Sequence, residues 1–220
     1  MQEFKLNEIS LFASLQEEEA ELMKKQLITR SFPKNSVVLN EGDNTDALYI
    51  IEEGRCKISK IHVDGKEIVL AVLEKGDYFG EMALIDELPR SASVITKEAS
   101  KFTIFLKEDF QRILLNNPAI SLNVMKGLSE RLRASLRQIE GLAFMDVYGR
   151  IARLLLELSY EEPEKAVRVV PEPLTHKEIA NRIGASREVV SRILKDLITG
   201  GYISSEQKII TIRNKLPHAW

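Results

Sequence analysis

The fold is decided by the stretch Thr175-His-Lys-Glu-Ile-Ala-Asn-Arg-Ile-Gly-Ala-Ser-Arg-Glu-Val-Val-Ser-Arg-Ile-Leu-Lys195. Thr175 and Glu178 have the spacing of a capping box, in which a hydroxyl and a carboxylate satisfy backbone N–H groups at a helix start. Gly184 supplies a turn residue that tolerates positive φ, and Ser186 can cap a second helix. The pattern therefore predicts two short helices joined by a turn, which is the layout of a DNA-reading helix-turn-helix.

The second helix of this pair is amphipathic. Its apolar residues fall at helical spacing and are expected to be buried, namely Val190, Ile193, Leu194 and Leu197. Its polar residues would then face outward, namely Arg187, Glu188, Ser191, Arg192 and Lys195. Surface helices also carry Arg and Glu for solubility alone, so this helix by itself leaves that alternative open.

The segment that follows weakens the solubility alternative. Residues 200–213, Gly-Gly-Tyr-Ile-Ser-Ser-Glu-Gln-Lys-Ile-Ile-Thr-Ile-Arg, predict two strands joined by a tight polar turn. Such a wing can set Lys208 against a phosphate. The candidate DNA-binding residues of this winged helix-turn-helix are Thr175, Ser186, Arg187, Glu188, Ser191, Arg192, Lys195 and Lys208.

Charge supports nucleic-acid binding locally rather than overall. The chain of 220 residues has a formal charge of −2, yet Leu174 to Lys215 contains eight Lys and Arg against four Asp and Glu. For DNA binding the distribution of charge matters more than its total.

Composition bounds the class of protein. With 44% hydrophobic and 29% charged residues, the chain can form two modest domains. Its one cysteine, Cys56, excludes an intrachain disulfide and suits a reducing cytoplasm; we expect it to pack as a small apolar residue. Signal-peptide and long apolar patterns are absent, so we expect a cytoplasmic protein without membrane insertion. Three scattered histidines and unpaired carboxylates predict neither catalytic nor metal-binding residues, so we do not expect an enzyme.

The N-terminal half has a different sequence pattern. From Val37 to about Phe105, short β-branched runs alternate with glycine-containing turn signals. The glycines recur at spacings of about eleven or twelve residues, as corners between strands would. This half is therefore expected to form an antiparallel β-roll, and the whole chain belongs to the α+β class.

One segment of this half indicates ligand chemistry: Phe79-Gly-Glu-Met-Ala-Leu-Ile-Asp-Glu-Leu-Pro-Arg-Ser-Ala-Ser-Val94. An apolar strand breaks at Gly80 into a helical turn, whose free N–H groups favour an anion. Arg90 can meet that anion with a planar fork of donors, and Ser91 can add a hydroxyl. Glu81 would accept from a ligand hydroxyl. A structural ion pair between Glu81 and Arg90 is the alternative reading of the same residues.

This segment resembles the phosphate-binding cassette of cyclic-nucleotide-binding domains. Together with the winged helix and the junction Gly141-Leu-Ala-Phe-Met-Asp-Val-Tyr-Gly-Arg-Ile-Ala152, it makes the whole chain similar to the CRP/FNR family of bacterial transcription regulators. The resemblance implies that Gly80 and neighbouring amides, including those of Met82 and Ala83, hold the cyclic phosphate with Arg90 and Ser91. It also implies that Glu81 accepts from the ribose 2′-hydroxyl.

Between the two halves, Pro118 to about Met145 predicts one long helix. Its seam repeats at spacings of three and four residues and is expected to pair two chains in parallel: Met125, Leu128, Leu132, Ser135, Ile139 and Leu142. A helix lying on its own β-roll is the alternative. By the resemblance, Ser135 faces the nucleotide base; cyclic-AMP-binding members have Thr-Ser where this chain has Ser135-Leu136, which weakens the inference of adenine specificity.

The combined expectation is a homodimeric transcription factor whose effector is cyclic AMP. By the resemblance, Arg187, Glu188 and Arg192 read TGTGA-like half-sites of an inverted repeat in double-stranded DNA, and RNA polymerase is a further partner. The expected domains are 1–117 (β-roll), 118–145 (dimerisation helix) and 146–220 (DNA reader). The alternatives are a regulator that answers to cyclic GMP, cyclic di-GMP or no small molecule, and the cyclic-nucleotide module of a kinase or channel.

Overall fold

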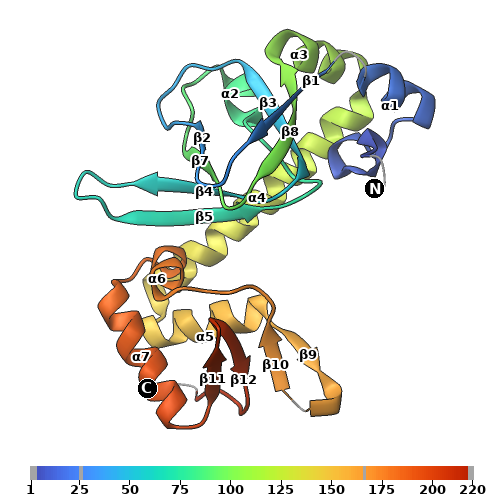
Figure 1. The fold of residues 1–220 in the computed structure, drawn as a ribbon. Coiled ribbons are helices and arrows are strands. Elements are labelled where there is room, and N and C mark those ends of the chain that lie inside the picture. Colours follow the sequence, from blue (N-terminus) through green and yellow to red (C-terminus); the bar gives the residue numbers. More distant parts are fainter. Residues whose placement is uncertain (1–3, 25–26, 166, 218–220) are drawn as a thin grey trace. The chain divides into compact units, whose positions relative to one another are not determined.

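The computed structural model of the chain describes residues 4–24, 27–165 and 167–217 (Figure 1). The chain forms two compact units: Met1–Lys60 with Leu70–Ala134, and Ile61–Val69 with Ser135–Trp220. The first is built mainly of antiparallel strands and the second mainly of helices with a small sheet, which confirms the α+β class.

Two four-stranded sheets make up the roll. Their strands are β1 (Ile28–Phe32), β2 (Val37–Leu39), β3 (Ala47–Glu53), β4 (Cys56–Ile61), β5 (Glu67–Leu73), β6 (Tyr78–Phe79), β7 (Ser93–Thr96) and β8 (Ser100–Leu106). The strand orders are β1-β8-β3-β6 and β2-β7-β4-β5. Strand β3 pairs antiparallel with β8 and β6, and β7 pairs antiparallel with β2 and β4. The predicted antiparallel roll is therefore confirmed.

Aromatic rings fill the space between these sheets. Phe79 lies edge-on to Phe102 with ring centroids 5.5 Å apart, and it stacks on Tyr49 at 5.1 Å. Burying each such side chain contributes roughly 1.5–3 kcal/mol. Cys56 is buried in the same cluster, as predicted, and burial raises the pKa of its thiol to about 12. Since Phe79 ends β6, this packing also fixes the strand from which the cassette begins.

The predicted glycine corners are present. Gly54 has a φ of +88°, and a Cβ built there would lie 2.3 Å from Ser100 Oγ and 2.6 Å from Ala99 O. Any other residue at this corner would therefore have to displace the neighbouring backbone.

Helices cover the first sheet (Figure 1). They are the short 3₁₀ turns η1 (Leu6–Glu8) and η2 (Ser10–Phe12), and the helices α1 (Glu17–Lys24), α2 (Glu81–Asp86) and α3 (Lys107–Asn116). The long helix α4 (Pro118–Phe144) follows, as predicted. Ile120 and Val124 of α4 are buried in the core of the first unit. Of the predicted seam, Met125 and Leu132 are 55% and 62% exposed, whereas Leu128 packs against the core of the first unit.

After the end of α4, the described residues of the second unit form three α-helices, one 3₁₀ turn and a sheet. Its elements are α5 (Val147–Leu158), β9 (Tyr160–Glu162), η3 (Pro163–Lys165), β10 (Val167–Val170), α6 (His176–Ile183), α7 (Arg187–Thr199), β11 (Ile203–Glu206) and β12 (Ile209–Ile212). The sheet order is β11-β12-β10-β9, and its pairings are antiparallel. The sequence predicted the hairpin β11–β12, whereas β9 and β10 are additional strands.

The apolar face of α7 packs into the core of this unit. Val190, Ile193, Leu194 and Leu197 are all buried, as predicted from their helical spacing. They pack in one cluster with Ile151 and Leu155 of α5 and Ile179 of α6. Across the part of the chain that the structure describes, we find no helix with the length and apolar character needed to cross a membrane.

Candidate cyclic-nucleotide pocket and DNA interface

Gly80 forms the turn between β6 and α2. Its φ is +91°, and a Cβ built on it would lie 2.8 Å from Arg90 Nη1 and 2.9 Å from Ala47 O. A side chain here would therefore be strained by the backbone conformation and would displace Arg90 as well. The chain passes close to Arg90 at this point because residue 80 is glycine.

Arg90 is buried and held by neutral acceptors. Its Nε donates to Thr45 Oγ1 at 2.7 Å, while Nη1 and Nη2 donate to the carbonyl oxygens of Gly80 at 2.5 Å and Ala47 at 2.6 Å. Burial lowers the pKa of Arg90, but a guanidinium titrates so far above neutral pH that it stays charged. Within the described ranges no carboxylate forms an ion pair with it. Its positive charge is therefore fixed in place and not neutralised.

Glu81 is paired with a different arginine. Its Oε1 accepts from Arg131 Nη1 of α4 at 2.6 Å, so the alternative of a structural Glu81–Arg90 ion pair is not observed. Glu81 is 1% exposed, and its Oε2 is buried without a donor among the residues placed by the structure. A buried carboxylate oxygen without a donor is costly, so this atom is suited to accept from a ligand hydroxyl.

Arg131 lies outside the motifs that predicted the site. Its guanidinium lies 4.7 Å from the ring centroid of Tyr78, and its Nη2 donates to the Tyr78 carbonyl oxygen. The approach of α4 to this strand is close, because a Cβ at Gly127 would lie 2.3 Å from Tyr78 Oη. Gly127 within α4 is a sequence signal of this contact.

The remaining predicted pocket residues fall into two groups. Met82 and Ser91 lie at the surface beside the turn, with Ser91 Oγ 4.0 Å from Met82 Sδ, and Ala83 is half-buried on α2. Ser135 and Leu136 are exposed on α4 and belong to the second unit. That Ser135 and Leu136 lie at the nucleotide base stays a prediction.

The cassette can therefore hold an anion that also carries a hydroxyl. Arg90 supplies an uncompensated cation, and Gly80 allows that guanidinium to lie close against the backbone of the turn. Glu81 Oε2 supplies a free acceptor. The fixed charge and the free acceptor match the phosphate and the ribose hydroxyl of a cyclic nucleotide. No group of three His, Cys, Asp or Glu that could hold a metal occurs in the described ranges.

The start of the helix-turn-helix has the predicted caps. Glu178 N donates to Thr175 Oγ1 at 3.1 Å, and Thr175 N donates to Glu178 Oε2 at 3.0 Å, which completes the capping box. Gly184 has a φ of +64°, and Ser186 Oγ accepts from Val189 N at 3.3 Å. These local bonds fix where α6 ends and α7 begins.

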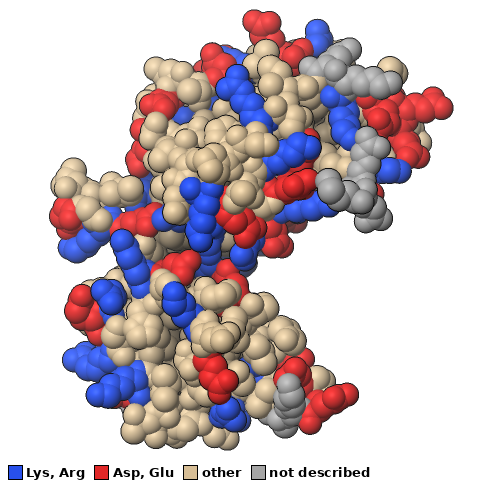
Figure 2. All heavy atoms as spheres, in the orientation of Figure 1, with Lys and Arg blue, Asp and Glu red and all other residues tan. Residues whose placement is uncertain are grey.

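The outward face of α7 is cationic. Figure 2 shows Lys and Arg side chains gathered over this helix, where Arg187, Arg192 and Lys195 are exposed together with Glu188. None of the three cations forms an ion pair with a carboxylate that the structure describes. Ser191 is half-buried, and its Oγ lies 2.7 Å from Nδ1 of His176, a residue outside the predicted DNA-binding set. This contact joins the first turn of α6 to the middle of α7.

The wing ends in a tight two-residue turn. Gln207 and Lys208 have φ values of +49° and +68°, so both adopt the left-handed conformation that a two-residue hairpin loop requires. The Lys208 carbonyl oxygen accepts from Leu174 N at 3.0 Å, which ties the wing to the residue before the helix-turn-helix. The Lys208 side chain is exposed beside it.

Comparison with known proteins matches two family models to this chain. Residues 29–117 match the cyclic nucleotide-binding domain, and residues 149–215 match the Crp-like helix-turn-helix domain. The two matches contain the cassette and the helix-turn-helix respectively.

Relatives resemble the chain over most of its length. It is 34% identical to the CRP-like cAMP-activated global transcriptional regulator of Mycobacterium tuberculosis over 192 residues, 86% of each chain. It is 30% identical to the cyclic AMP receptor protein of Thermus thermophilus over 203 residues, 92% of each chain. Among solved structures, the c-di-GMP responsive global regulator of Xanthomonas campestris matches with a TM-score of 0.78 and 27% identity, covering 89% of this chain and 98% of that one.

Proposed function

Because this chain belongs to the CRP/FNR family, whose members are transcription regulators and not enzymes, we propose that it is a homodimeric transcription factor activated by cyclic AMP. The observation that carries the proposal is the pair of unmatched groups in the cassette. Among the residues that the structure places, Arg90 keeps a buried positive charge without a carboxylate partner, and Glu81 keeps a buried oxygen without a donor.

Each unmatched group has a counterpart on a cyclic nucleotide. The guanidinium of Arg90 neutralises the cyclic phosphate, with Ser91 and the amides of Met82 and Ala83 as further donors after Gly80. Glu81 Oε2 accepts from the ribose 2′-hydroxyl. Arg131 pairs with the other carboxylate oxygen of Glu81 at 2.6 Å and so holds the carboxylate in place with Oε2 left for the ligand. The positive charge of Arg90 thus stays available to the phosphate, and Glu81 Oε2 stays available to the sugar hydroxyl.

The choice of cyclic AMP rests on relatives and on Ser135. Two relatives at 30–34% identity are named for cyclic AMP. Ser135 keeps one hydroxyl for the base, whereas Leu136 offers only apolar packing. Cyclic di-GMP is the second candidate effector, because the solved structure that matches at a TM-score of 0.78 is named for it.

Calorimetry with the purified protein tests both candidates. Cyclic AMP, cyclic GMP and cyclic di-GMP are titrated into the parent chain, Arg90→Leu and the control Arg112→Leu, which removes an exposed arginine of the same unit. We expect cyclic AMP to bind most tightly, Arg90→Leu to lose roughly 2–5 kcal/mol of binding free energy, and Arg112→Leu to bind as the parent does. Unchanged binding by Arg90→Leu would show that the cassette is not the site.

DNA recognition is proposed through α7. Arg187 and Arg192 present two donors each to guanine O6 and N7, and Glu188 accepts from cytosine N4. The preferred DNA is a TGTGA-like inverted repeat, with half-sites about one helical turn apart to match a two-fold dimer. Phosphate contacts come from Thr175, Ser186, Ser191, Lys195 and Lys208. Residues 1–117, 118–145 and 146–220 then serve as sensor, dimerisation helix and DNA reader, and RNA polymerase is the partner at the promoter.

A further inference from the structure

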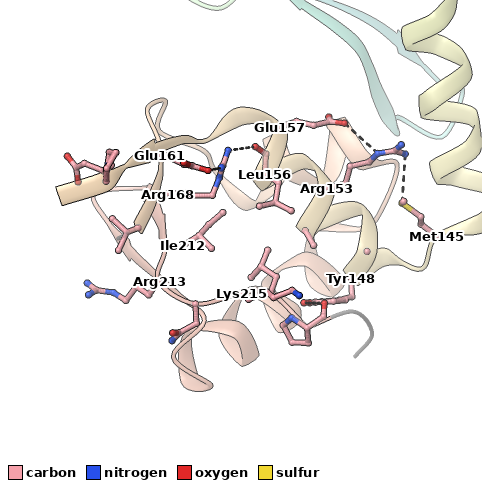
Figure 3. Close-up of a pocket in the computed structure, with 18 residues that line it drawn as sticks. Met145, Tyr148, Arg153, Leu156, Glu157, Glu161, Arg168, Ile212, Arg213 and Lys215 are labelled. Atoms are coloured by element: carbon pink, nitrogen blue, oxygen red, sulfur yellow. Dashed lines mark hydrogen bonds and ion pairs between the residues drawn. The ribbon is translucent and has the colours of Figure 1, made fainter. Parts of the chain in front are cut away.

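A cavity of about 750 Å³ lies wholly within the second unit (Figure 3). One wall is the face of α5 that carries Tyr148, Ala152 and Leu156. The opposite wall comes from the sheet and the segment after it, including Ile212 and Leu216. A volume of this size lies within the range of small-molecule sites, which are mostly apolar with a few polar groups. None of the residues assigned above to the nucleotide or to DNA lines it.

Two arginines of the lining already have carboxylate partners. Arg168 Nη1 pairs with Glu161 Oε1 at 2.7 Å, and its other nitrogens donate to Ser159. Arg153 lies 3.5 Å from Glu157 Oε1. Their guanidinium groups are therefore held by their own partners and are poorly placed to bind a ligand.

Lys215 is different. It lines the cavity, and in Figure 3 its side chain extends toward the side that Tyr148 lines. No carboxylate in the described part of the chain pairs with it. Arg213, whose Nε donates to Ser204 Oγ at 2.9 Å, extends away from the remaining lining residues in the same view. The cavity therefore offers one positive charge at an apolar surface.

The ion pairs of the lining limit the charge of a ligand. Glu157 and Glu161 are taken up by Arg153 and Arg168, so these four side chains contribute no net charge to the cavity. A single negative charge on the ligand matches the one cation at Lys215. We propose that this cavity binds an amphipathic carboxylate of the fatty-acid type, with its carboxylate on Lys215 and its apolar body along Ala152, Leu156, Ile212 and Leu216.

Calorimetry with the full chain tests this site, using sodium decanoate below its micelle concentration as the probe. Decyltrimethylammonium has the same apolar body with the opposite head charge. Two variants fill the cavity, Ala152→Trp and Leu156→Trp, and one removes the head-group partner, Lys215→Gln. Lys34→Gln, an exposed lysine of the first unit, is the matched control. Thermal melting of each variant shows that it is folded.

We expect decanoate to bind to the parent and to Lys34→Gln, and to bind Lys215→Gln about tenfold more weakly, as loss of one charged hydrogen bond predicts. At least one folded cavity-filling variant should show no binding, and saturating cyclic AMP should leave decanoate affinity unchanged. Equal affinity for decyltrimethylammonium, competition by cyclic AMP, or parent-like binding by both folded tryptophan variants would overturn the proposal. If the parent chain does not bind decanoate and Ala152→Trp changes the self-association of the chain, the proposal is wrong. The cavity would then be a contact surface for a second copy of the chain.

Discussion

A buried arginine whose acceptors are all uncharged is an unusual arrangement for a purely structural residue. Removing a guanidinium from water costs several kcal/mol, and a carboxylate partner ordinarily offsets part of that cost. Arg90 donates instead to one hydroxyl and two carbonyl oxygens, which orient its charge without cancelling it. Such a site gains the missing compensation when an anion binds, so ligand binding and local stability should be coupled.

Gly80 and Gly76 allow this geometry to be tested with a matched pair. Both have a φ of +91°, but a Cβ at Gly80 would lie 2.8 Å from Arg90 Nη1, whereas a Cβ at Gly76 would have nothing within 4 Å. Each alanine substitution should lower the free energy of unfolding by about 1–3 kcal/mol because of its backbone conformation. Gly80→Ala should lower it further and should also weaken cyclic-AMP binding. Denaturant unfolding and calorimetry measure both effects, and equal losses for the two variants would contradict a role for the close approach.

Glu52 is a buried carboxylate whose role is structural. Burial raises its pKa, but Lys101 Nζ at 2.7 Å and the Thr103 hydroxyl outweigh burial, so the pKa of Glu52 is lowered overall. A lowered folded-state pKa gives stability that is complete above the unfolded-state value and is lost as pH falls through the folded-state value. Glu52→Gln should therefore destabilise the chain at pH 7 and differ less from the parent at pH 3. Denaturant unfolding at both pH values checks this, and a pH-independent difference would exclude the ionised carboxylate as the cause.

At the scale of elements, the sequence predicted those features that are set by neighbours along the chain. Thr175 and Glu178 mark a helix start because the capping box is a local contact, and Val190 to Leu197 mark a buried face because helical spacing is local. The corner at Gly54 was predictable for the same reason, since a left-handed turn excludes most other residues.

Contacts between distant segments could not be predicted in this way. Arg131 is one of several arginines on α4, and only the fold brings it to Glu81, fifty residues away in the chain. His176 reaches Ser191 because the turn at Gly184 folds α6 against α7. Strands β9 and β10 were missed because they are only three and four residues long and flank an acidic, proline-containing segment.

Substitutions in α7 and in the wing should affect DNA binding differently. Glu188 on α7 is assigned to a base, so Glu188→Ala should relax choice at one base pair by about 1–3 kcal/mol and keep the salt dependence. Lys208 on the wing is assigned to a phosphate, so Lys208→Ala should weaken all sequences alike and lower the salt slope by about one. In-vitro selection and anisotropy titrations at several salt concentrations separate the two. Base-specific loss from Lys208→Ala would contradict this division.

At the scale of the molecule, the exposed seam of α4 is the surface through which we propose that two copies of the chain pair. Leu132 is 62% exposed in the seam, while Leu115, at the end of α3, is 84% exposed outside it. Burying a leucine in a dimer contributes about 1.5–3 kcal/mol, and a buried charge costs more. Leu132→Glu should therefore shift the chain to monomers at micromolar concentration, and Leu115→Glu should leave the dimer intact. Sedimentation equilibrium measures both, and a stable Leu132→Glu dimer would place the interface elsewhere.

The sensor and the DNA reader lie in different compact units, so any regulation must be a coupling free energy between two sites. Such coupling is reciprocal: if cyclic AMP raises operator affinity by some factor, the operator raises cyclic-AMP affinity by the same factor. We expect a factor of at least about five, at the lower end of measured couplings. Anisotropy of a labelled operator with and without cyclic AMP measures the change in operator affinity. Calorimetry of cyclic AMP with and without operator measures the change in cyclic-AMP affinity. Arg90→Leu should reduce both factors to one while leaving basal operator binding in place. Equal operator affinity with and without the nucleotide that the cassette binds would mean that binding in the first unit does not control the second.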